Sequence, residues 1–326
     1  KNIEVIDIGE YCSDLQSANQ IKDPSYIYPF VLEEIKILKK YKPDLAVIDC
    51  RFSAILSCKS LGIPAVFIVN SEGLFCKTYL PNFGLSKLLQ YLITPFSQML
   101  VSNFKSQYIN PLSEGARMLN KNFKKDKLLD MVYIIPEPKG YLPQLENKYD
   151  TRYVGSIWWD GFDEFIPGWL DKIKPDGRTI YLTFGGTGYD PKKLLSLSKL
   201  LIEKGYRVIV SASNIVDIGE FRQLDNLYVE RFLPGFAVCQ KVDLVVCRGG
   251  IGTMSQALIS GKPVVAVPFN PDQYLHCFRF EELGLGKCVS NLRLIDLILL
   301  DWENFKQRAR DLPISWILDT IEEVLR

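Results

Sequence analysis

One stretch, residues 243–268, constrains the fold of this chain more than any other. An apolar run at 243–247 indicates a buried strand, and the sequence Arg-Gly-Gly-Ile-Gly follows it directly. A helical segment then ends at Gly261, which suits the left-handed position after a helix, and Pro263 opens a second apolar run. The order strand, Gly-rich turn, helix, strand is the repeating unit of a parallel α/β sheet.

The Gly-rich turn has the composition of a diphosphate site. Gly249, Gly250 and Gly252 let backbone N–H groups approach a ligand, and a helix N-terminus carries roughly half a positive charge. Arg248, at the end of the strand, adds a planar cation that can pair with phosphate oxygens. A tight turn without any ligand would contain the same glycines, so the turn alone favours neither interpretation.

The residues that follow resemble a known signature. Between Cys247 and Gly286 the chain carries Gly-Gly-x-Gly-Thr, Ala-Leu, Gly-x-Pro, Pro, Asp-Gln and a closing Gly-x-Gly, in order. This spacing resembles the donor-binding signature of UDP-glycosyltransferases with the GT-B fold. It is also similar to that of the bacterial enzyme that forms lipid II with UDP-N-acetylglucosamine. The resemblance implies an α/β fold with two Rossmann-like domains that face each other across a cleft.

The resemblance and the element pattern together predict three parts. Residues 1–150 are expected to form an N-terminal, acceptor-binding Rossmann-like domain, and residues 151–312 a C-terminal domain that binds the nucleotide-sugar donor. Residues 313–326 are expected to form a helix that packs back on the first domain. The sequence begins with Lys inside an apolar strand pattern at 3–8, so we expect a first strand and loop to be missing from it.

The resemblance assigns donor contacts to this second domain. Arg248 and the backbone from Gly249 to Thr253 would hold the diphosphate, and Asp272 and Gln273 would contact hydroxyls of the donor sugar. At the position of Arg248 the family usually has His, whereas the lipid II enzyme has Arg. Gln256 stands where both groups usually carry a Glu that holds the ribose hydroxyls.

Two further loops of the second domain are candidates for donor contacts. Phe232 and Leu233 lie in a segment that resembles the family's base-binding loop, in which the aromatic ring stacks on the base. Gly235 stands in that loop where the family usually has Gln. A second Gly-rich turn, with Gly186 and Thr187, follows a predicted strand at 179–184 and could meet the donor phosphates or sugar.

The group that accepts the proton is less well defined. In the resembling enzymes the base is usually a His in a loop after the first strand, and that segment has no counterpart here. Asp49 ends a predicted strand where plant members place the Asp that orients this His, so we expect it to be that orienter or the base itself. The alternative is that Asp49 caps the next helix. His276, the single histidine, is interpreted as a donor-side or packing residue.

Composition narrows the possible partners. The net charge is +1, which gives no electrostatic reason to expect nucleic acid. The eight cysteines include no Cys-x-x-Cys pair, so we expect reduced thiols, no metal site and no cofactor besides the UDP-sugar co-substrate. No signal peptide or membrane-spanning run is visible, which indicates a cytoplasmic protein. The aromatic-rich segment 73–112 could line an apolar acceptor pocket, bind the surface of a membrane, or form ordinary core.

These observations predict an inverting, metal-independent glycosyltransferase. It would move a sugar from a UDP-sugar to a hydroxyl of a lipid or of a small apolar acceptor. The alternative is a catalytically inactive subunit that binds the nucleotide-sugar within a glycosyltransferase complex, because the first loop has no counterpart and Gln256 replaces a Glu.

Overall fold

A computed structural model describes most of the chain between residues 24 and 289. It covers 24–49, 51–71, 112, 114–119, 121, 123, 128–142, 149–157, 166–185, 191–212, 219, 221, 224–268, 271–289 and 307. The chain divides into two compact units, and the boundary in the described part falls between Val154 and Gly155. The predicted strand at 3–8, most of the aromatic segment at 73–112 and the predicted helix at 313–326 lie outside the described residues.

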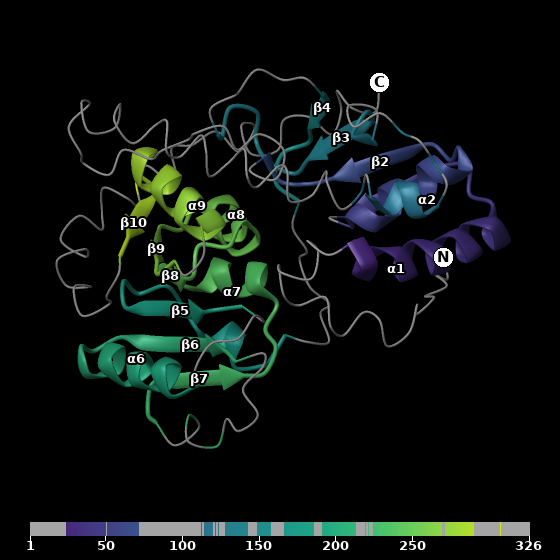
Figure 1. Cartoon of the computed structure of the whole chain (residues 1–326). Coiled ribbons are helices and arrows are strands. Elements are labelled where there is room, and N and C mark those ends of the chain that lie inside the picture. Colours follow the sequence, from purple (N-terminus) through teal and green to yellow (C-terminus); the bar gives the residue numbers. More distant parts are fainter. Residues whose placement is uncertain are drawn as a thin grey trace. The chain divides into compact units, whose positions relative to one another are not determined.

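In the described part of the first unit, four strands form a parallel sheet. Their order in the sheet is their order in the chain: β1 (Ala46–Asp49), β2 (Ala65–Ile68), β3 (Val132–Ile135) and β4 (Asp150–Tyr153). Helices α1 (Pro24–Tyr41) and α2 (Phe52–Leu61) pack on each other (Figure 1). Because all four strands are parallel, their carboxyl ends lie along one edge of the sheet.

The core of the first unit follows the apolar residues of these strands. Ile48, Phe67, Tyr133 and Ile135 are buried in one cluster together with residues of α2. The rings of Phe67 and Tyr133 meet edge to face, with centroids 5.9 Å apart. Side chains of alternate strand residues thus fix the register of three adjacent strands.

Among the residues described in the second unit, six strands form a parallel sheet. Its order is β10 (Gly286–Cys288), β9 (Val264–Ala266), β8 (Leu244–Cys247), β5 (Thr179–Thr183), β6 (Arg207–Ser211) and β7 (Leu227–Glu230). Its helices are α6 (Pro191–Glu203), α7 (Gly235–Lys241), α8 (Ile251–Ile259) and α9 (Pro271–Glu282), and a short 3₁₀ helix covers Leu170–Lys172. Figure 1 shows α6 beside β6 and β7, and α8 and α9 beside β8 to β10.

The strand order reverses in the middle of this sheet. From β5 the chain proceeds to β6 and β7 on one side, and it then returns to β8, β9 and β10 on the other. Right-handed crossovers therefore place α6 on one face of the sheet, and α8 and α9 on the opposite face. The strands β5 and β8 are direct neighbours, with Thr183 paired to Cys247 at their carboxyl ends.

Most predicted elements are present, with bounds that shift by a few residues. The segment Phe52–Leu61 forms a helix, and Gly261 has a φ of 63°. Four of the described elements were not predicted: β4, α7, β10 and the 3₁₀ helix at Leu170–Lys172. Each has seven residues or fewer and little apolar periodicity, because β4 reads Asp-Thr-Arg-Tyr and α7 begins at a glycine after a proline.

The chain after β3 remains within the first unit. Glu137, Tyr141 and Leu142 are buried, and β4 pairs with β3. Residues 151–154, which we expected in the second domain, therefore pack with the first unit.

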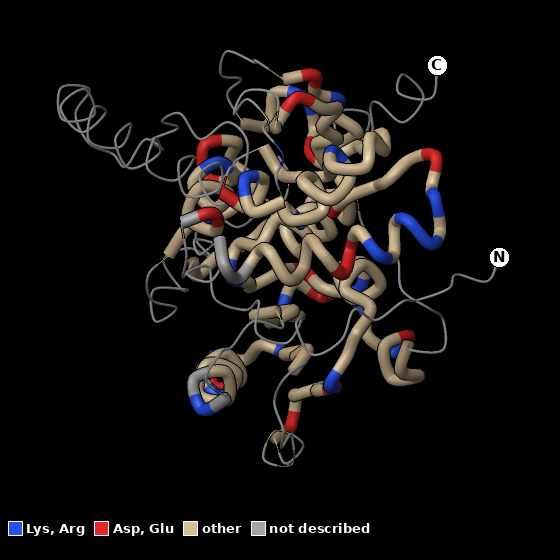
Figure 2. Tube along the Cα trace, turned by 45° about the vertical axis from the view of Figure 1, so that its right-hand side comes forward, with Lys and Arg blue, Asp and Glu red and all other residues tan. Residues whose placement is uncertain are grey.

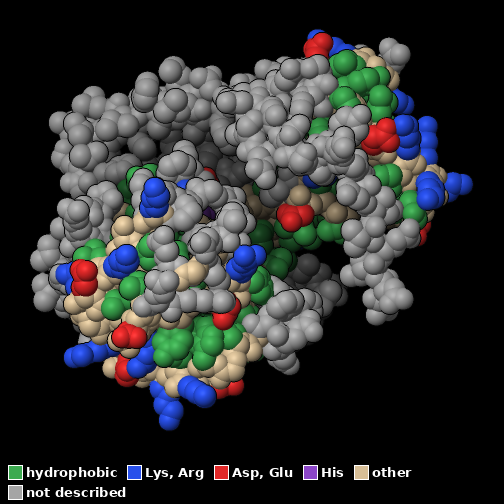
Figure 3. Space-filling view, turned by 90° about the horizontal axis from the view of Figure 1, so that it is seen from below, with side chains coloured by type: hydrophobic (Ala, Val, Ile, Leu, Met, Phe, Trp, Pro, Cys, Tyr) green, Lys and Arg blue, Asp and Glu red, His purple; other side chains and the backbone are tan. Residues whose placement is uncertain are grey.

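Charged residues of both signs are spread over the described residues. Figure 2 shows Lys and Arg as well as Asp and Glu at many places along the trace, and in the view of Figure 3 charged side chains are interspersed with apolar ones. Among the described helices, none combines the length and the hydropathy needed to cross a membrane.

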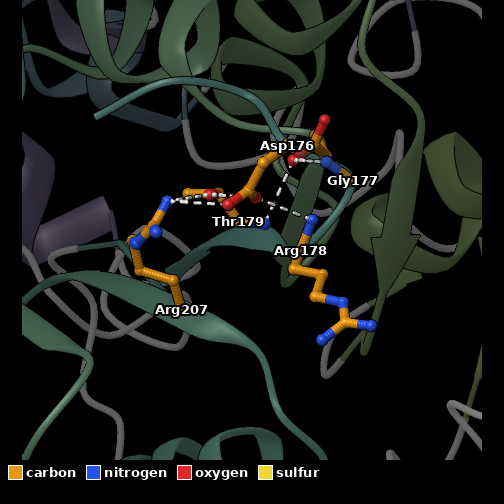
Figure 4. A network of polar contacts seen from close by, with 6 residues as sticks. Asp176, Gly177, Arg178, Thr179 and Arg207 are labelled. Atoms are coloured by element: carbon orange, nitrogen blue, oxygen red, sulfur yellow. Dashed lines mark hydrogen bonds and ion pairs between the residues drawn. The ribbon is translucent and has the colours of Figure 1, made fainter. Parts of the chain in front are cut away.

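A polar network ties together the amino ends of the central strands of the second unit (Figure 4). Asp176 accepts hydrogen bonds from the Arg178 N–H at 3.1 Å and the Thr179 hydroxyl at 3.3 Å, and it lies 3.4 Å from Arg207. The carboxylate of Asp243 accepts from the N–H groups of Gly177 and Thr179 at 2.9 and 3.0 Å. Burial by itself raises the pKa of Asp176. The hydrogen bonds to Asp176 and the charge of Arg207 together lower the pKa by more than burial raises it, so the pKa lies below its usual value.

We expect this network to make stability depend on pH. The pKa of Asp176 is lower in the folded than in the unfolded chain. The ionised carboxylate therefore stabilises the folded state fully at pH values above its ordinary pKa of 3.8, and this stabilisation is lost as the pH falls through the lowered pKa of the folded state. Asp176→Asn should therefore reduce the free energy of unfolding at neutral pH, and the difference from the wild type should shrink in acid. Urea unfolding at a series of pH values tests this.

Asp225→Asn provides the matched control. Asp225 is an exposed carboxylate of the same unit, and within the described part of the chain no side-chain partner is found for it. A pH-independent effect of Asp176→Asn, equal to that of Asp225→Asn, would contradict the prediction.

Candidate functional site

The candidate site lies where β5 and β8 end side by side. In an open parallel sheet, the loops after two neighbouring strands leave in opposite directions at the point where the strand order reverses. Ligands bind in the space between these loops, at the carboxyl ends of the strands. Gly185 follows β5, and Arg248 and Gly249 follow β8. Gly186 and Thr187, which were predicted to contact the donor, lie outside the described residues.

The turn after β8 depends on a glycine. Gly249 has a φ of 87°, in the left-handed region that side chains disfavour. A Cβ at this residue would collide with the Cys277 sulfur and lie 3.0 Å from the carbonyl oxygen of Gln273. The Gly249 N–H donates to the Cys247 sulfur at 3.3 Å. The turn is therefore packed tightly on its inner side by α9.

The outer side of the same turn is open. Gly250 is the N-cap of α8, with φ −67° and ψ 133°, and no side chain caps the helix. The first turn of α8 contains no acidic residue, and a Cβ at Gly250 or Gly252 would meet nothing within 4 Å. Open space in front of an uncapped helix N-terminus suits an anionic ligand.

Arg248 brings a cation to this edge of the sheet. It lies between the last residue of β8 and the Gly-rich turn, and its side chain is 6% exposed. Charges act more strongly in such a shielded place than in bulk water, because the effective dielectric constant is lower. The guanidinium and the helix N-terminus thus contribute positive potential at neighbouring positions.

The predicted base-binding loop connects β7 with α7. Phe232 is 42% exposed, which is unusual for a ring of this size, whereas Leu233 is 3% exposed and belongs to the interior. The loop therefore offers one aromatic ring to the solvent and is anchored by its neighbour.

Gln256 connects this loop with α8. Its side-chain oxygen lies against Gly235, in the place that a Cβ of residue 235 would occupy. Gly235 and Gln256 are two of the positions at which the chain departs from the resembling family's pattern, and the structure shows that they touch. The Gly235–Gln256 contact therefore places a neutral amide between the base-binding loop and the Gly-rich turn.

The first turn of α9 completes the described part of the site. Asp272 is exposed, Gln273 is 8% exposed, and the carbonyl of Gln273 lies next to Gly249. His276, one turn further on, is 1% exposed. The burial of His276 agrees with its interpretation as a packing residue.

In the first unit, Asp49 lies at the carboxyl end of β1 and is exposed. The N-cap of α2 is Arg51 rather than Asp49, and no side chain caps that helix, so the capping alternative is wrong. Within the described residues, the Asp49 carboxylate forms no ion pair or side-chain hydrogen bond. It is thus accessible for proton transfer.

A buried carboxylate that sequence reasoning missed fixes the segment after Asp49. Glu34 of α1 accepts hydrogen bonds from Arg51 Nε at 2.6 Å, Ser53 Oγ at 2.7 Å and Ser57 Oγ at 2.5 Å. The only sequence signal is a charged residue among the apolar positions of α1.

A second buried carboxylate was missed at the next two strand ends. Glu137, after β3, accepts hydrogen bonds from both the N–H and the hydroxyl of Ser71, after β2. Glu137 is 0% exposed, so we infer that it positions the loop after β2.

The described residues contain no group of three or more His, Cys, Asp or Glu side chains that could hold a metal ion. The positively charged groups that the described residues bring to the candidate site are Arg248 and the N-terminus of α8.

Comparisons with known proteins agree with this geometry. Residues 200–299 match the family model described as Glycosyltransferase family 28 C-terminal domain. The chain is 29% identical over 283 residues to the "PGL/p-HBAD biosynthesis rhamnosyltransferase" of Mycobacterium bovis, covering 81% of this chain and 60% of that protein. It is 26% identical over 270 residues to the "NDP-glycosyltransferase YjiC" of Bacillus licheniformis, covering 79% of this chain and 62% of that protein. The chain thus spans about three fifths of the length of these relatives.

The fold of this chain is similar to that of a solved glycosyltransferase structure. The Streptomyces sp. SF2575 glycosyltransferase SsfS6, complexed with thymidine diphosphate, superposes with a TM-score of 0.66 at 20% identity, covering 97% of this chain and 76% of that one. The predicted fold class, α/β with two Rossmann-like domains of the GT-B type, is confirmed. The resemblance to glycosyltransferases of this fold is confirmed as well.

Two glycines of the turn should respond oppositely to alanine. Gly249→Ala places a methyl group against Cys277 and Gln273 at a left-handed φ, so it should lower the free energy of unfolding by about 1–3 kcal/mol. Gly252→Ala adds a methyl group that points into open space on α8, so it should raise the free energy of unfolding by about 0.5–1 kcal/mol. Urea unfolding of both variants tests this, and equal stabilities would contradict the described packing of the turn.

Proposed function

We propose that this chain is an inverting, metal-independent glycosyltransferase. It would move a sugar from a nucleoside diphosphate sugar to an acceptor hydroxyl. The observation that carries the proposal is the uncapped, open N-terminus of α8 beside the buried Arg248, at the point where the strand order reverses. The glycosyltransferase names of the matched relatives support it.

The proposed reaction is a single displacement. The acceptor oxygen attacks the anomeric carbon while the diphosphate leaves from the opposite side, which inverts the configuration. Arg248 and the backbone N–H groups at the start of α8 stabilise the negative charge that develops on the diphosphate. This positive potential is built into the protein, so the proposal assigns no role to a divalent cation.

Asp49 is proposed to receive the proton of the acceptor hydroxyl. It is exposed at a strand end and has no side-chain partner among the described residues, as a carboxylate that must exchange a proton requires. It acts as the base itself or orients a histidine that takes the proton. The hydrogen bonds of Arg51 and Ser53 to Glu34 hold the chain just beyond it.

The donor is proposed to be a UDP-sugar or dTDP-sugar. The signature resembles that of UDP-sugar enzymes, whereas SsfS6 was solved with thymidine diphosphate. A Glu at position 256 would favour a ribose through charge-assisted hydrogen bonds, but Gln256 is neutral and contacts Gly235. We therefore propose that the site accepts 2′-deoxyribose as well as ribose.

The acceptor is proposed to be a lipid or a small apolar alcohol. The aromatic composition of residues 73–112 supports an apolar partner, and so does the biosynthetic name of the mycobacterial relative. A cytoplasmic protein that contacts the membrane surface would fit such an acceptor. Rhamnose, named in that relative, is the first sugar to test.

Two variants separate binding from catalysis. Arg248→Ala should weaken the binding of UDP and dTDP about 10–100-fold, because a hydrogen bond to a charged group contributes about 1.5–3 kcal/mol. Asp49→Asn should leave nucleotide affinity unchanged and lower kcat about 10²–10⁴-fold. Calorimetric titration and release of the nucleotide in the presence of acceptor provide the two measurements.

Arg248→Lys is the control for the first variant, because it keeps the charge but not the planar fork. Undiminished affinity in Arg248→Ala would refute the phosphate role of this residue. Nucleotide binding without turnover of any donor would favour the alternative, an inactive nucleotide-sugar-binding subunit.

The Gly235–Gln256 contact generates a prediction about the donor nucleoside. Four ligands separate the two variables: UDP, 2′-deoxy-UDP, dTDP and 5-methyl-UDP. UDP and 2′-deoxy-UDP differ only in the sugar of the nucleoside, and so do 5-methyl-UDP and dTDP. The wild type should bind the ribose and the deoxyribose member of each pair with affinities that differ by no more than a few-fold. Gln256→Glu should shift the ratio toward ribose by about tenfold, the effect of one charge-assisted hydrogen bond. A strong ribose preference in the wild type would contradict the prediction.

A further inference from the structure

Several thiols lie directly beneath the Gly-rich turn. Cys247 on β8 and Cys288 on β10 both pair with Ala266 of β9, so the three residues form one row across the sheet. The Cβ position of Gly249 lies 3.7 Å from the Ala266 methyl group and in contact with the sulfur of Cys277 on α9. The small side chain of Ala266 thus leaves room for Cys277 between the two strand cysteines.

Cys277 and Cys288 are hydrogen-bonded to each other. This hydrogen bond lowers the pKa of Cys288 in spite of its burial and the nearby Glu281, and together with burial it raises the pKa of Cys277. Cys277 is 1% exposed, whereas Cys288 is only half-buried. Accessible thiols with lowered pKa beside a second thiol are typical of oxidation-sensitive pairs.

A carboxylate holds Cys288 in its place relative to α9. Glu281, one turn after Cys277, accepts a hydrogen bond from the Cys288 N–H at 3.2 Å and from Lys287 Nζ at 2.7 Å. The backbone of β10 is therefore fixed to the helix next to the two sulfurs. The two thiols are kept together by the fold and do not meet by chance.

We propose that Cys277 and Cys288 form a reversible disulfide whose formation loosens the Gly-rich turn. A peroxide serves as the oxidant. The Cys288 thiolate attacks one peroxide oxygen, the O–O bond breaks, and a sulfenic acid and hydroxide form. The Cys277 sulfur then attacks the sulfenic sulfur, the S–O bond breaks, and water leaves with the Cys277 proton. Overall, two thiols lose two electrons and one peroxide is reduced to two waters.

The consequence for the turn follows from the position of the Cys277 sulfur. It fills the space beside Gly249, and a disulfide requires the two sulfurs to approach to about 2.05 Å. The Cys277 sulfur must then turn away from Gly249 toward Cys288. Because the Gln273 carbonyl contacts the same point of the turn, the first turn of α9 loses part of its support as well.

The disulfide stands independently of the proposed function, whereas its effect on donor binding rests on that function. The experiment uses the whole chain, reduced or treated with hydrogen peroxide. Peptide mapping after alkylation should identify a 277–288 disulfide that dithiothreitol removes. Amide hydrogen exchange in the peptide around Gly249 should become faster in the oxidised protein. UDP or dTDP affinity should fall about fivefold or more, in the range of typical coupling between sites.

Matched variants make the outcome specific. Cys288→Ser should abolish the disulfide and both effects, and Cys58→Ser, which removes a buried thiol of the first unit, should change neither. Absence of the 277–288 disulfide, or a disulfide between Cys247 and Cys277 in its place, would overturn the proposal. Unchanged hydrogen exchange in the disulfide form would overturn the coupling to the turn. A reduced protein that binds no nucleotide would refute the proposed function. Peptide mapping and amide hydrogen exchange around Gly249 would then still decide whether the disulfide forms and loosens the turn.

Discussion

The close packing of α9 against the backbone of Gly249 is the contact on which the candidate site depends. A side chain at this position would collide with the Cys277 sulfur and crowd the Gln273 carbonyl. With Gly249 in the left-handed conformation, the chain turns sharply out of β8 and starts α8 without a side-chain cap. One face of the turn is thus closed by protein and the other is open to a ligand.

The same packing connects groups that are far apart in the sequence. α9 brings Gln273 and Cys277 to the turn, β10 brings Cys288 to Cys277, and α8 brings Gln256 to Gly235 at the start of α7. The base-binding loop, the Gly-rich turn and the thiol pair therefore share one packed region of the second unit. This arrangement gives a physical reason for a change at the thiols to reach the backbone of the Gly-rich turn.

The first unit relies on buried carboxylates rather than on glycines. Glu34 connects α1 to the start of α2, and Glu137 connects the ends of β2 and β3. A buried carboxylate is costly unless hydrogen bonds compensate it, so each must keep its partners. Glu137 lies just beyond the end of β3, whereas Glu34 of α1 binds the segment that follows the end of β1. Asp49 differs from them because it is exposed at its own strand end.

The sequence by itself determined the alternation of strands and helices and the turn after β8. Those features depend on local apolar runs and on glycines at fixed spacing, and both can be read directly from the linear sequence. Only the tertiary structure decided that Gly235 touches Gln256, that Glu34 holds Arg51 and that Cys277 lies between Gly249 and Cys288. It also decided that β4 and β10 are strands, because such short segments become strands through pairing with a neighbour rather than through their own periodicity.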